Sequence, residues 1–136
     1  MLDDFNAEFG SWSPPLDVLE RRFARMLDRD DAFVLVAGGP GTPIGFALVT
    51  LRPTPYHDGP LATLDELYVV PRLRDRGHGT ELLQAMLREL HRRACGEVHI
   101  NVDEGDVDTR RFYESHGFVN QHPGSDERML CYLQEL

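Results

Sequence analysis

The fold of this chain is decided by residues 64–94, which read LDELYVVPRLRDRGHGTELLQAMLRELHRRA. The stretch from Leu64 to Val70 is mostly apolar or β-branched and has the length of a strand. Pro71 has no N–H to give to a sheet, so we expect the strand to end there. From His78 onward the apolar residues recur at steps of three and four, which predicts an amphipathic helix. Its apolar face comprises Leu82, Leu83, Met86, Leu87, Leu90 and Ala94.

The turn between this strand and helix, residues 74–79 (RDRGHG), has the features of an anion site. The first backbone N–H groups of a helix lack intrahelical partners, and the helix dipole favours negative charge beside them. Gly77 and Gly79 let a bulky group approach the backbone closely. Arg72, Arg74 and Arg76 add local positive charge to an acidic chain. The sequence therefore predicts a phosphate-binding loop and an anionic cofactor.

Size and composition limit the class of protein. The 136 residues suffice for one domain with its own core, and we expect residues 1–136 to form it. The net charge of −9 argues against a nucleic-acid surface. No window is apolar enough to cross a membrane, and the acidic N-terminus lacks a signal pattern, which predicts a cytoplasmic protein. Cys95 and Cys131 form no CxxC unit, so we expect buried free thiols. The histidines lack ligand spacing, and we expect no metal site.

The remaining segments predict an α/β fold with a mixed sheet. A strand, a long helix and a strand without a hairpin turn indicate a parallel pair with a right-handed crossover. Gly45 lies inside a strand and marks either a bulge or a close backbone approach. The expected helices cover residues 1–12, the stretch from Pro14-Pro15 to about 28, and a short segment that ends at Gly117. The expected strands cover 33–37, 44–51, 64–70, 98–102, a segment from 118 and 129–133, with polar loops at 52–61 and 122–126.

The stretch LDELYVVPRLRDRGHGTELL, followed by RRFYESHGF at residues 110–118, resembles the GCN5-related N-acetyltransferase (GNAT) superfamily. The strongest motif is Arg74-x-x-Gly77-x-Gly79, which matches the family's Arg/Gln-x-x-Gly-x-Gly/Ala signature between a strand and a helix. The resemblance covers the chain from about residue 15 onward. It implies a mixed, mostly antiparallel sheet flanked by helices, with a parallel β-α-β unit that binds acetyl-CoA. The family's first strand is expected to be missing here, which would expose a sheet edge.

By this resemblance, the loop amides hold the pyrophosphate of acetyl-CoA, and the pantetheine arm lies like an extra strand against residues 67–70. The strands at 64–70 and 98–102 are expected to splay apart to admit it. Backbone groups near the thioester would position the acetyl carbonyl. The cofactor-binding residues implied are Leu67, Tyr68, Val69, Val70, Arg72, Arg74, Asp75, Arg76, Gly77, His78, Gly79, Thr80 and Asp106.

The resemblance also implies catalytic residues. An alkyl amine with a pKa of about 10 must lose a proton before it attacks. Asp65 matches the catalytic carboxylate of polyamine-type members, whereas Glu66 falls in the commoner family wording ELYV. Strand alternation predicts opposite faces for the two, so one at most is expected to serve as the base. Tyr113 matches the family tyrosine that hydrogen-bonds the cofactor sulfur and protonates the departing thiolate.

The sequence also departs from the family pattern. Asp75 stands where members often carry Gly, which places a carboxylate near the pyrophosphate. Asp106 and Thr109 stand where the second motif commonly has Asn and Ala, which affects the cofactor contacts of that helix.

These features predict an acyltransferase that moves acetyl from acetyl-CoA to a primary amine of a small molecule or peptide by direct attack in a ternary complex. The alternative is a GNAT-fold module that binds acetyl-CoA or a partner for regulation and has lost catalysis. A Rossmann-type nucleotide binder fits poorly, because the loop is one glycine short of that fingerprint. Tyr56, His57 and Asp58, with Asp103-Glu104, are the candidate acceptor site for a cationic amine. Homodimers are common in the family, so a homodimer is expected by analogy.

Overall fold

The computed structural model describes residues 1–134, which form four α-helices, one 3-10 helix and four strands. In chain order they are α1 (Leu2–Glu8), α2 (Leu16–Leu27), β1 (Ala32–Gly39), β2 (Thr42–Arg52), β3 (Leu61–Val69), η1 (Pro71–Leu73), α3 (His78–Arg92), β4 (Glu97–Ile100) and α4 (Val107–Ser115). The chain clusters into two compact units, of which the first spans Met1–Ile100 and the second begins at Asn101.

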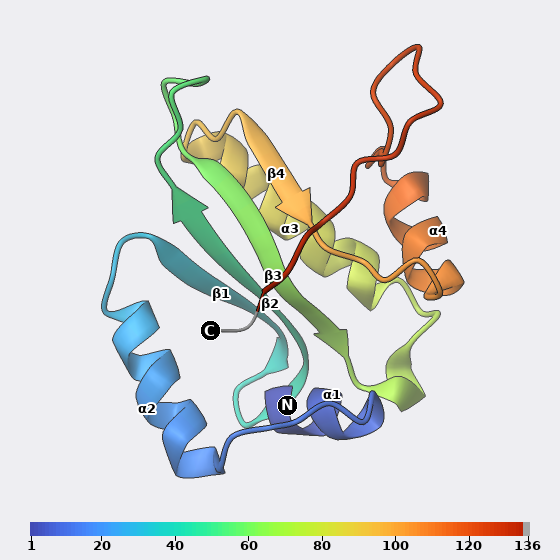
Figure 1. Cartoon of the computed structure of the whole chain (residues 1–136). Coiled ribbons are helices and arrows are strands. Elements are labelled where there is room, and N and C mark those ends of the chain that lie inside the picture. Colours follow the sequence, from blue (N-terminus) through green and yellow to red (C-terminus); the bar gives the residue numbers. More distant parts are fainter. Residues whose placement is uncertain (135–136) are drawn as a thin grey trace. The chain divides into compact units, whose positions relative to one another are not determined.

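The first unit is built on a four-stranded mixed sheet of order β1-β2-β3-β4 (Figure 1). β1 pairs with β2 and β2 with β3 in antiparallel fashion, whereas β3 and β4 are parallel. α3 joins the parallel pair, as the strand-helix-strand pattern predicts. Within residues 1–134 no strand precedes α1, so β1 forms an edge of the sheet. The predicted fold class is confirmed.

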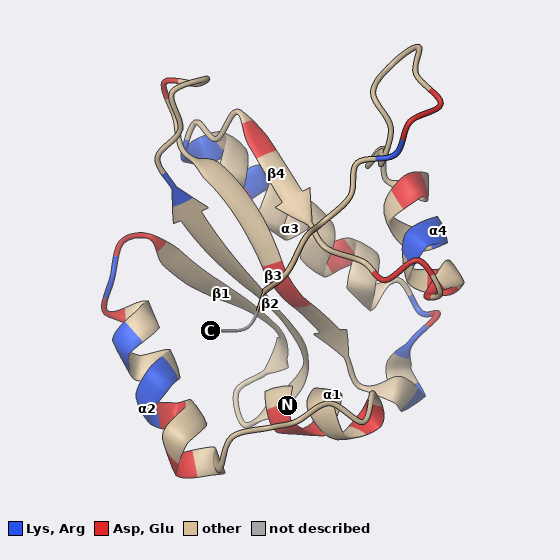
Figure 2. Cartoon of the chain, in the orientation of Figure 1, with Lys and Arg blue, Asp and Glu red and all other residues tan. Residues whose placement is uncertain are grey.

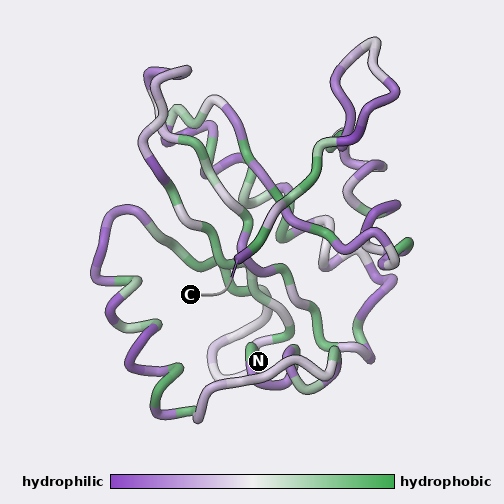
Figure 3. Tube along the Cα trace, in the orientation of Figure 1, coloured by the Kyte–Doolittle hydropathy of each residue, from purple (hydrophilic) through white to green (hydrophobic). Residues whose placement is uncertain are grey.

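The central strand β2 is buried on both of its faces. Phe46 and Leu48 form one core cluster with Tyr68. Partly buried side chains of α1, α2, β1 and the end of β3 pack against it, namely Met1, Leu2, Phe5, Phe23, Met26, Val34 and Val70. Ala47, between Phe46 and Leu48 in the chain, is fully buried, and so is Val49. Figure 3 shows this band of hydrophobic residues along the middle strands. A sheet covered on both faces needs apolar residues at consecutive positions, which explains the unbroken run FALV.

α3 supplies the cover of the second face, and in Figure 1 it lies behind the sheet. Its buried residues are Leu82, Leu83, Met86 and Leu90, as the helical spacing predicted. Near its end, Glu89 accepts hydrogen bonds from Arg92 and Arg93, which lower the pKa of that carboxyl to about 2. The cations suit the helix C-terminus, where the dipole favours positive charge.

The two final strands of the prediction are wrong. Residues after 117 form only an isolated bridge between Gln121 and Arg128 within the described part of the chain. Phe118 packs its ring on Tyr113 of α4 at 5.5 Å between centroids and so serves the helix rather than a sheet. Residues 129–133 are exposed. They form no strand because a strand-like sequence needs a neighbouring strand with which to hydrogen-bond. For the same reason Cys131 is exposed, whereas Cys95 is partly buried; both are free thiols.

Gly45 confirms the close backbone approach that its position suggested. A Cβ atom there would lie 2.6 Å from the carbonyl oxygen of Tyr68 and 3.1 Å from Cδ1 of Leu82. An irregularity of the hairpin register lies beside it, because Ala37 pairs with Gly45 while Gly38 pairs with Pro43. Only glycine leaves room for β3 and α3 at this point.

We therefore expect Gly45→Ala to destabilise the protein by about 1–3 kcal/mol, because the backbone carbonyl of Tyr68 cannot move aside without straining the sheet. Urea unfolding followed by circular dichroism measures the change. Gly105→Ala is the matched control, since a Cβ at Gly105 meets nothing within 4 Å. Equal stability of the two variants would show that the sheet can yield at Gly45.

Candidate functional site

The edge of β3 that faces β4 is only partly paired. Parallel pairing runs from Leu61 opposite Glu97 to Leu64 opposite Ile100 and stops there. β3 continues to Val69, still paired with β2 on its other side. Among the described residues no strand covers the second edge from Glu66 to Val69. Backbone groups of that stretch that point away from β2 are therefore open to an extended ligand, except the carbonyl oxygen of Val69, which accepts a hydrogen bond from Nε of Arg74.

The side chains of residues 67–70 are buried or half-buried in the protein. Tyr68 and Val69 are buried, and Tyr68 belongs to the core cluster under α1 and α2. Leu67 and Val70 are half-buried. The side chains of Tyr68 and Val69 are thus not accessible to a ligand, and the role predicted for residues 67–70 needs only their backbone, which stays a prediction.

The loop that the sequence predicts to bind phosphate, here taken as residues 74–80 and called the phosphate-binding loop, follows β3 and η1 and leads into α3. Gly77 is the N-cap of α3 with φ 88°, and within the described chain no side chain caps the helix. The first N–H groups of a 15-residue helix are thus left for a ligand. Figure 2 shows basic residues before this helix, with an acidic residue among them. That residue, Asp75, has φ 58°, a left-handed conformation in which glycine is most at ease and which Asp and Asn tolerate best among other residues.

The loop side chains differ in their contacts. Arg74 binds Glu8 of α1, whereas Arg72 and Arg76 are exposed. His78 Nδ1 lies 3.3 Å from Oε2 of Glu81 within the first turn of α3. Thr80 and Gly79 are half-buried in the same turn. The predicted loop residues are therefore gathered around one helix end.

A β-bulge places the two candidate bases. Leu48 pairs with Glu66, but the next residue of β2, Val49, pairs with Leu64, so Asp65 is an extra residue in β3. An inserted residue interrupts the alternation of side chains. The expectation of opposite faces for Asp65 and Glu66 therefore rests on a regularity that β3 does not have. Bulges are frequent beside active sites, where they redirect a side chain.

Both carboxyls have raised pKa values. Burial is the main cause for Asp65, and hydrogen bonds with the hydroxyl and backbone of Thr50 partly oppose it. Asp65 still has solvent access, but the surrounding protein limits hydration of its charge. Burial also raises the pKa of Glu66, and repulsion from Asp65 adds to the effect. Two adjacent carboxyls with raised pKa values are typical of a proton-transfer site.

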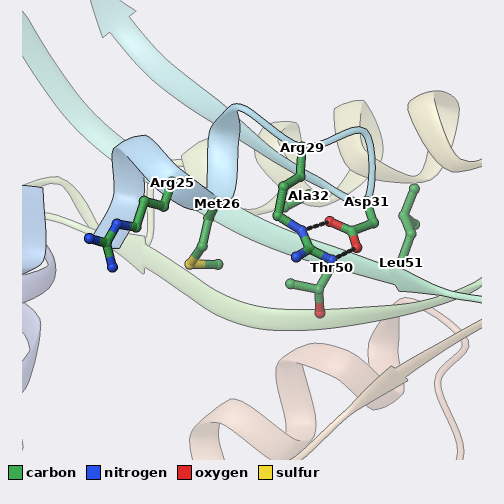
Figure 4. Close-up of a pocket in the computed structure, with 7 residues that line it drawn as sticks. All are labelled: Arg25, Met26, Arg29, Asp31, Ala32, Thr50 and Leu51. Atoms are coloured by element: carbon green, nitrogen blue, oxygen red, sulfur yellow. Dashed lines mark hydrogen bonds and ion pairs between the residues drawn. The ribbon is translucent and has the colours of Figure 1, made fainter. Parts of the chain in front are cut away.

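A pocket of about 390 Å³ lies beside the bulge. Thr50, the hydrogen-bond partner of Asp65, is one of its lining residues, and Figure 4 shows Thr50 with the ion pair of Arg29 and Asp31 near it. Sequence reasoning missed these residues. Thr50 could not be identified from the sequence, because its contact with Asp65 depends on how β2 pairs with β3. The remaining lining residues are Arg25, Met26, Ala32 and Leu51.

A second pocket of about 410 Å³ contains two of the three predicted acceptor residues. His57 and Asp58 line it, together with Asp30 and Asp31, whereas Tyr56 is 84% exposed and takes no part. The ring of His57 packs on the backbone of Gly96, where a Cβ would approach to 2.5 Å, and its Nε2 lies 3.3 Å from Oε2 of Glu97. Asp31 and Leu51 line both pockets, so the two are neighbours. The acidic pair Asp30-Asp31 before β1 was the sequence signal that could have identified this surface.

The second unit carries the other predicted residues. Asp106 is the N-cap of α4, and its Oδ1 accepts a hydrogen bond of 3.1 Å from the N–H of Thr109. This contact accounts for an aspartate at the cap position and involves only the backbone of Thr109. Tyr113 is 8% exposed and packs between the rings of Phe112 and Phe118. Asp103 and Glu104 precede the helix, and Glu104 binds Arg128.

Comparisons with known proteins agree with this geometry. Residues 1–118 match the acetyltransferase (GNAT) family. The crystal structure of a protein from Arthrobacter sp. FB24, assigned as an acetyltransferase, is 44% identical in sequence to this chain and superposes on it with a TM-score of 0.91. The match covers 99% of this chain and 85% of the Arthrobacter chain. No curated protein matches significantly.

Two more distant crystal structures share the fold. One is the aminoglycoside acetyltransferase meta-AAC0020 from an uncultured soil metagenomic sample, in complex with sisomicin, at 22% identity and a TM-score of 0.78, with 97% of this chain and 83% of that chain covered. The other is AAC(6')-Iy in complex with the bisubstrate analogue CoA-S-monomethyl-acetylneamine, at 24% identity and a TM-score of 0.71, with 90% and 82% covered. Family match and fold together show that this chain belongs to the GNAT acetyltransferase family.

Proposed function

We propose that the protein transfers an acetyl group from acetyl-CoA to a primary amine of a small molecule or peptide. The observation that carries this proposal is the open edge of β3 from Glu66 to Val69, which leads through the phosphate-binding loop to the uncapped start of α3. An extended arm with amide groups fits a strand edge, and a diphosphate fits a helix N-terminus. Acetyl-CoA joins these two parts in one molecule.

Each residue then has a definite task. Backbone groups of residues 67–70 that point away from β2, other than the Val69 carbonyl bound by Arg74, bind the pantetheine arm and orient the thioester. Acetyl-CoA supplies an activated acetyl group. The amine nitrogen bonds to the acetyl carbon as the carbon–sulfur bond breaks, the amine proton passes to Asp65 or Glu66, and the departing sulfur takes up a proton. The resemblance to the family makes Tyr113 the candidate donor of that proton. Both reactants are held together, so no acyl-enzyme intermediate is required.

The second pocket supports a cationic acceptor, because three carboxylates, Asp30, Asp31 and Asp58, and only one arginine, Arg52, line it. The first pocket has Arg25 and Arg29 against Asp31 and gives no such support. Carboxylates attract an ammonium group at neutral pH and raise its local concentration. In the neighbouring complexes the acceptors are aminoglycosides, which carry several amines. We therefore propose that a compound with more than one amine is the preferred acceptor.

The proposal predicts that coenzyme A is released from acetyl-CoA only when a suitable amine is present. Release of the thiol is followed with a thiol-reactive dye for a panel of polyamines, aminoglycosides, amino-acid derivatives and peptides, and mass spectrometry identifies the acetylated product. If acetyl-CoA binds tightly but no amine in the panel is acetylated, the chain is a binding module instead.

Replacement of the base should lower activity without lowering stability. We expect Asp65→Asn or Glu66→Gln to decrease kcat by about 100-fold or more, with the larger loss at whichever carboxylate takes the proton. Steady-state kinetics from pH 5 to 9 measures the loss and shows the disappearance of the acidic limb in that variant. Losses below about tenfold in both variants would favour a proton relay through water.

The stability of Glu66→Gln distinguishes a catalytic role from a structural one. A carboxyl whose pKa is raised in the folded state binds its proton more tightly there, so it favours folding as the pH falls through that pKa and disfavours folding above it. Removal of the charge should therefore leave the melting temperature at pH 7 unchanged or raised. A lower melting temperature would indicate that Glu66 stabilises the fold.

Tyr113→Phe tests the general acid. Phenylalanine fills the same space between Phe112 and Phe118, so the fold should be kept. We expect kcat to fall by about 100-fold while the KM for acetyl-CoA stays within about twofold. The loss should be smaller with an acetyl thioester whose thiol has a low pKa, because that sulfur needs no proton to leave. Unchanged turnover would exclude Tyr113 as the acid.

A further inference from the structure

Arg74 has partners on three sides. Its Nη1 and Nη2 donate hydrogen bonds to the two carboxylate oxygens of Glu8 at 2.5 and 2.8 Å, and its Nε donates to the carbonyl oxygen of Val69 at 2.9 Å. The guanidinium also lies 5.6 Å from the ring centroid of Tyr68. Glu8 lies at the end of α1, 66 residues away in the chain. One side chain thus joins α1, β3 and the start of the phosphate-binding loop.

These contacts leave Arg74 little capacity for a ligand. Three of its five N–H groups are donors to protein oxygens. The bidentate pair with Glu8 raises the pKa of the guanidinium and lowers that of the carboxyl, so both stay charged and neutralise each other. The positive charge that remains for a diphosphate comes from Arg72 and Arg76. The motif arginine therefore acts within the protein rather than on the cofactor.

The loop depends on such an anchor. Asp75 and Gly77 both have left-handed backbone conformations, so no helix or strand ladder holds the chain between Leu73 and His78. The direction in which the loop amides point is then set by its two ends. α3 fixes one end, and the contacts of Arg74 fix the other.

Apolar contacts also hold α1 against Tyr68, next to Arg74. The ring of Phe5 meets that of Tyr68 edge-on at 5.6 Å, and Phe9 packs on Phe5 at 4.9 Å. Tyr68 in turn lies beneath Arg74. Tyr68 therefore contacts α1 on one side and the motif arginine on the other. A shift of α1 would move Glu8, Arg74 and the loop together.

We propose that Glu8 is a positioning residue for acetyl-CoA, which it favours by holding Arg74 and hence the loop amides in the binding conformation. This inference rests on the proposed function, since it requires coenzyme A to bind at the loop. Coupling is reciprocal, so bound coenzyme A must in turn stabilise α1. A helix of seven residues that carries no buried side chain gains much of its order from such contacts.

Glu8→Gln tests this role, because glutamine keeps the shape and removes the charge. Isothermal titration should show that its Kd for coenzyme A is about threefold to fivefold above that of the wild type, with KM for acetyl-CoA raised equally and kcat unchanged. Arg74→Lys should weaken binding at least as much, because it also loses the bond to the Val69 carbonyl, and the double variant should bind no more weakly than Arg74→Lys, since the contact with Glu8 is already lost. Glu20→Gln, a charge removal on the exposed face of α2, is the control and should bind coenzyme A like the wild type.

Hydrogen exchange of the wild-type chain gives a second measurement that needs no variant. Coenzyme A should slow amide exchange in residues 2–8 as well as in residues 75–80, and Glu8→Gln should keep only the second effect. An unchanged Kd in Glu8→Gln, or α1 exchange indifferent to coenzyme A in the wild type, would overturn the positioning role alone. A wild type that fails to bind coenzyme A would overturn the proposed function and this inference with it.

Discussion

The extra residue in β3 is the constraint on which the site depends. β3 pairs with β4 only as far as Leu64, and the next residue, Asp65, is the one without a partner in β2. A bulge bends its strand and increases the local twist, and this one lies where the parallel pairing ends. Asp65 hydrogen-bonds Thr50 of β2, although the two residues are not opposite each other in the register. The open stretch of the β3 edge and a candidate base thus meet at one local irregularity.

The sequence predicted the elements that have strong hydrophobic periodicity. It failed to predict those whose structure depends on pairing with another strand. α3, the hairpin and the parallel pair follow from apolar spacing and from residues such as Pro71, whose effect is local. Residues 129–133 alternate like a strand, but a strand exists only if another offers its edge, and none does within residues 1–134. The bulge was invisible for a related reason. Nothing in LDELYV indicates which residue is the extra one, because the choice depends on the register with β2.

Candidate site residues show the same division. The loop glycines could be identified from the sequence, because backbone conformation depends on near neighbours. His57 and Asp58 were predicted from charge, and the structure places them in a pocket whose other acids, Asp30 and Asp31, come from a distant loop. Tyr56, chosen on the same grounds, points to solvent. Polarity in a loop therefore identified the region but not which side chains face inward.

Charge near the phosphate-binding loop shows why counting residues is not enough. Arg72, Arg74 and Arg76 suggest three cations opposed by Asp75 alone. Glu8 compensates the middle one, and it does so from a helix that the sequence places far away. The remaining cations are exposed and screened by salt, so under the proposed function most of the attraction for a diphosphate comes from the amides and dipole at the start of α3. On that proposal, affinity is governed by loop conformation more than by net charge. The contacts that hold the loop, Glu8 with Arg74 and Arg74 with Val69, are then the ones on which the proposed binding depends.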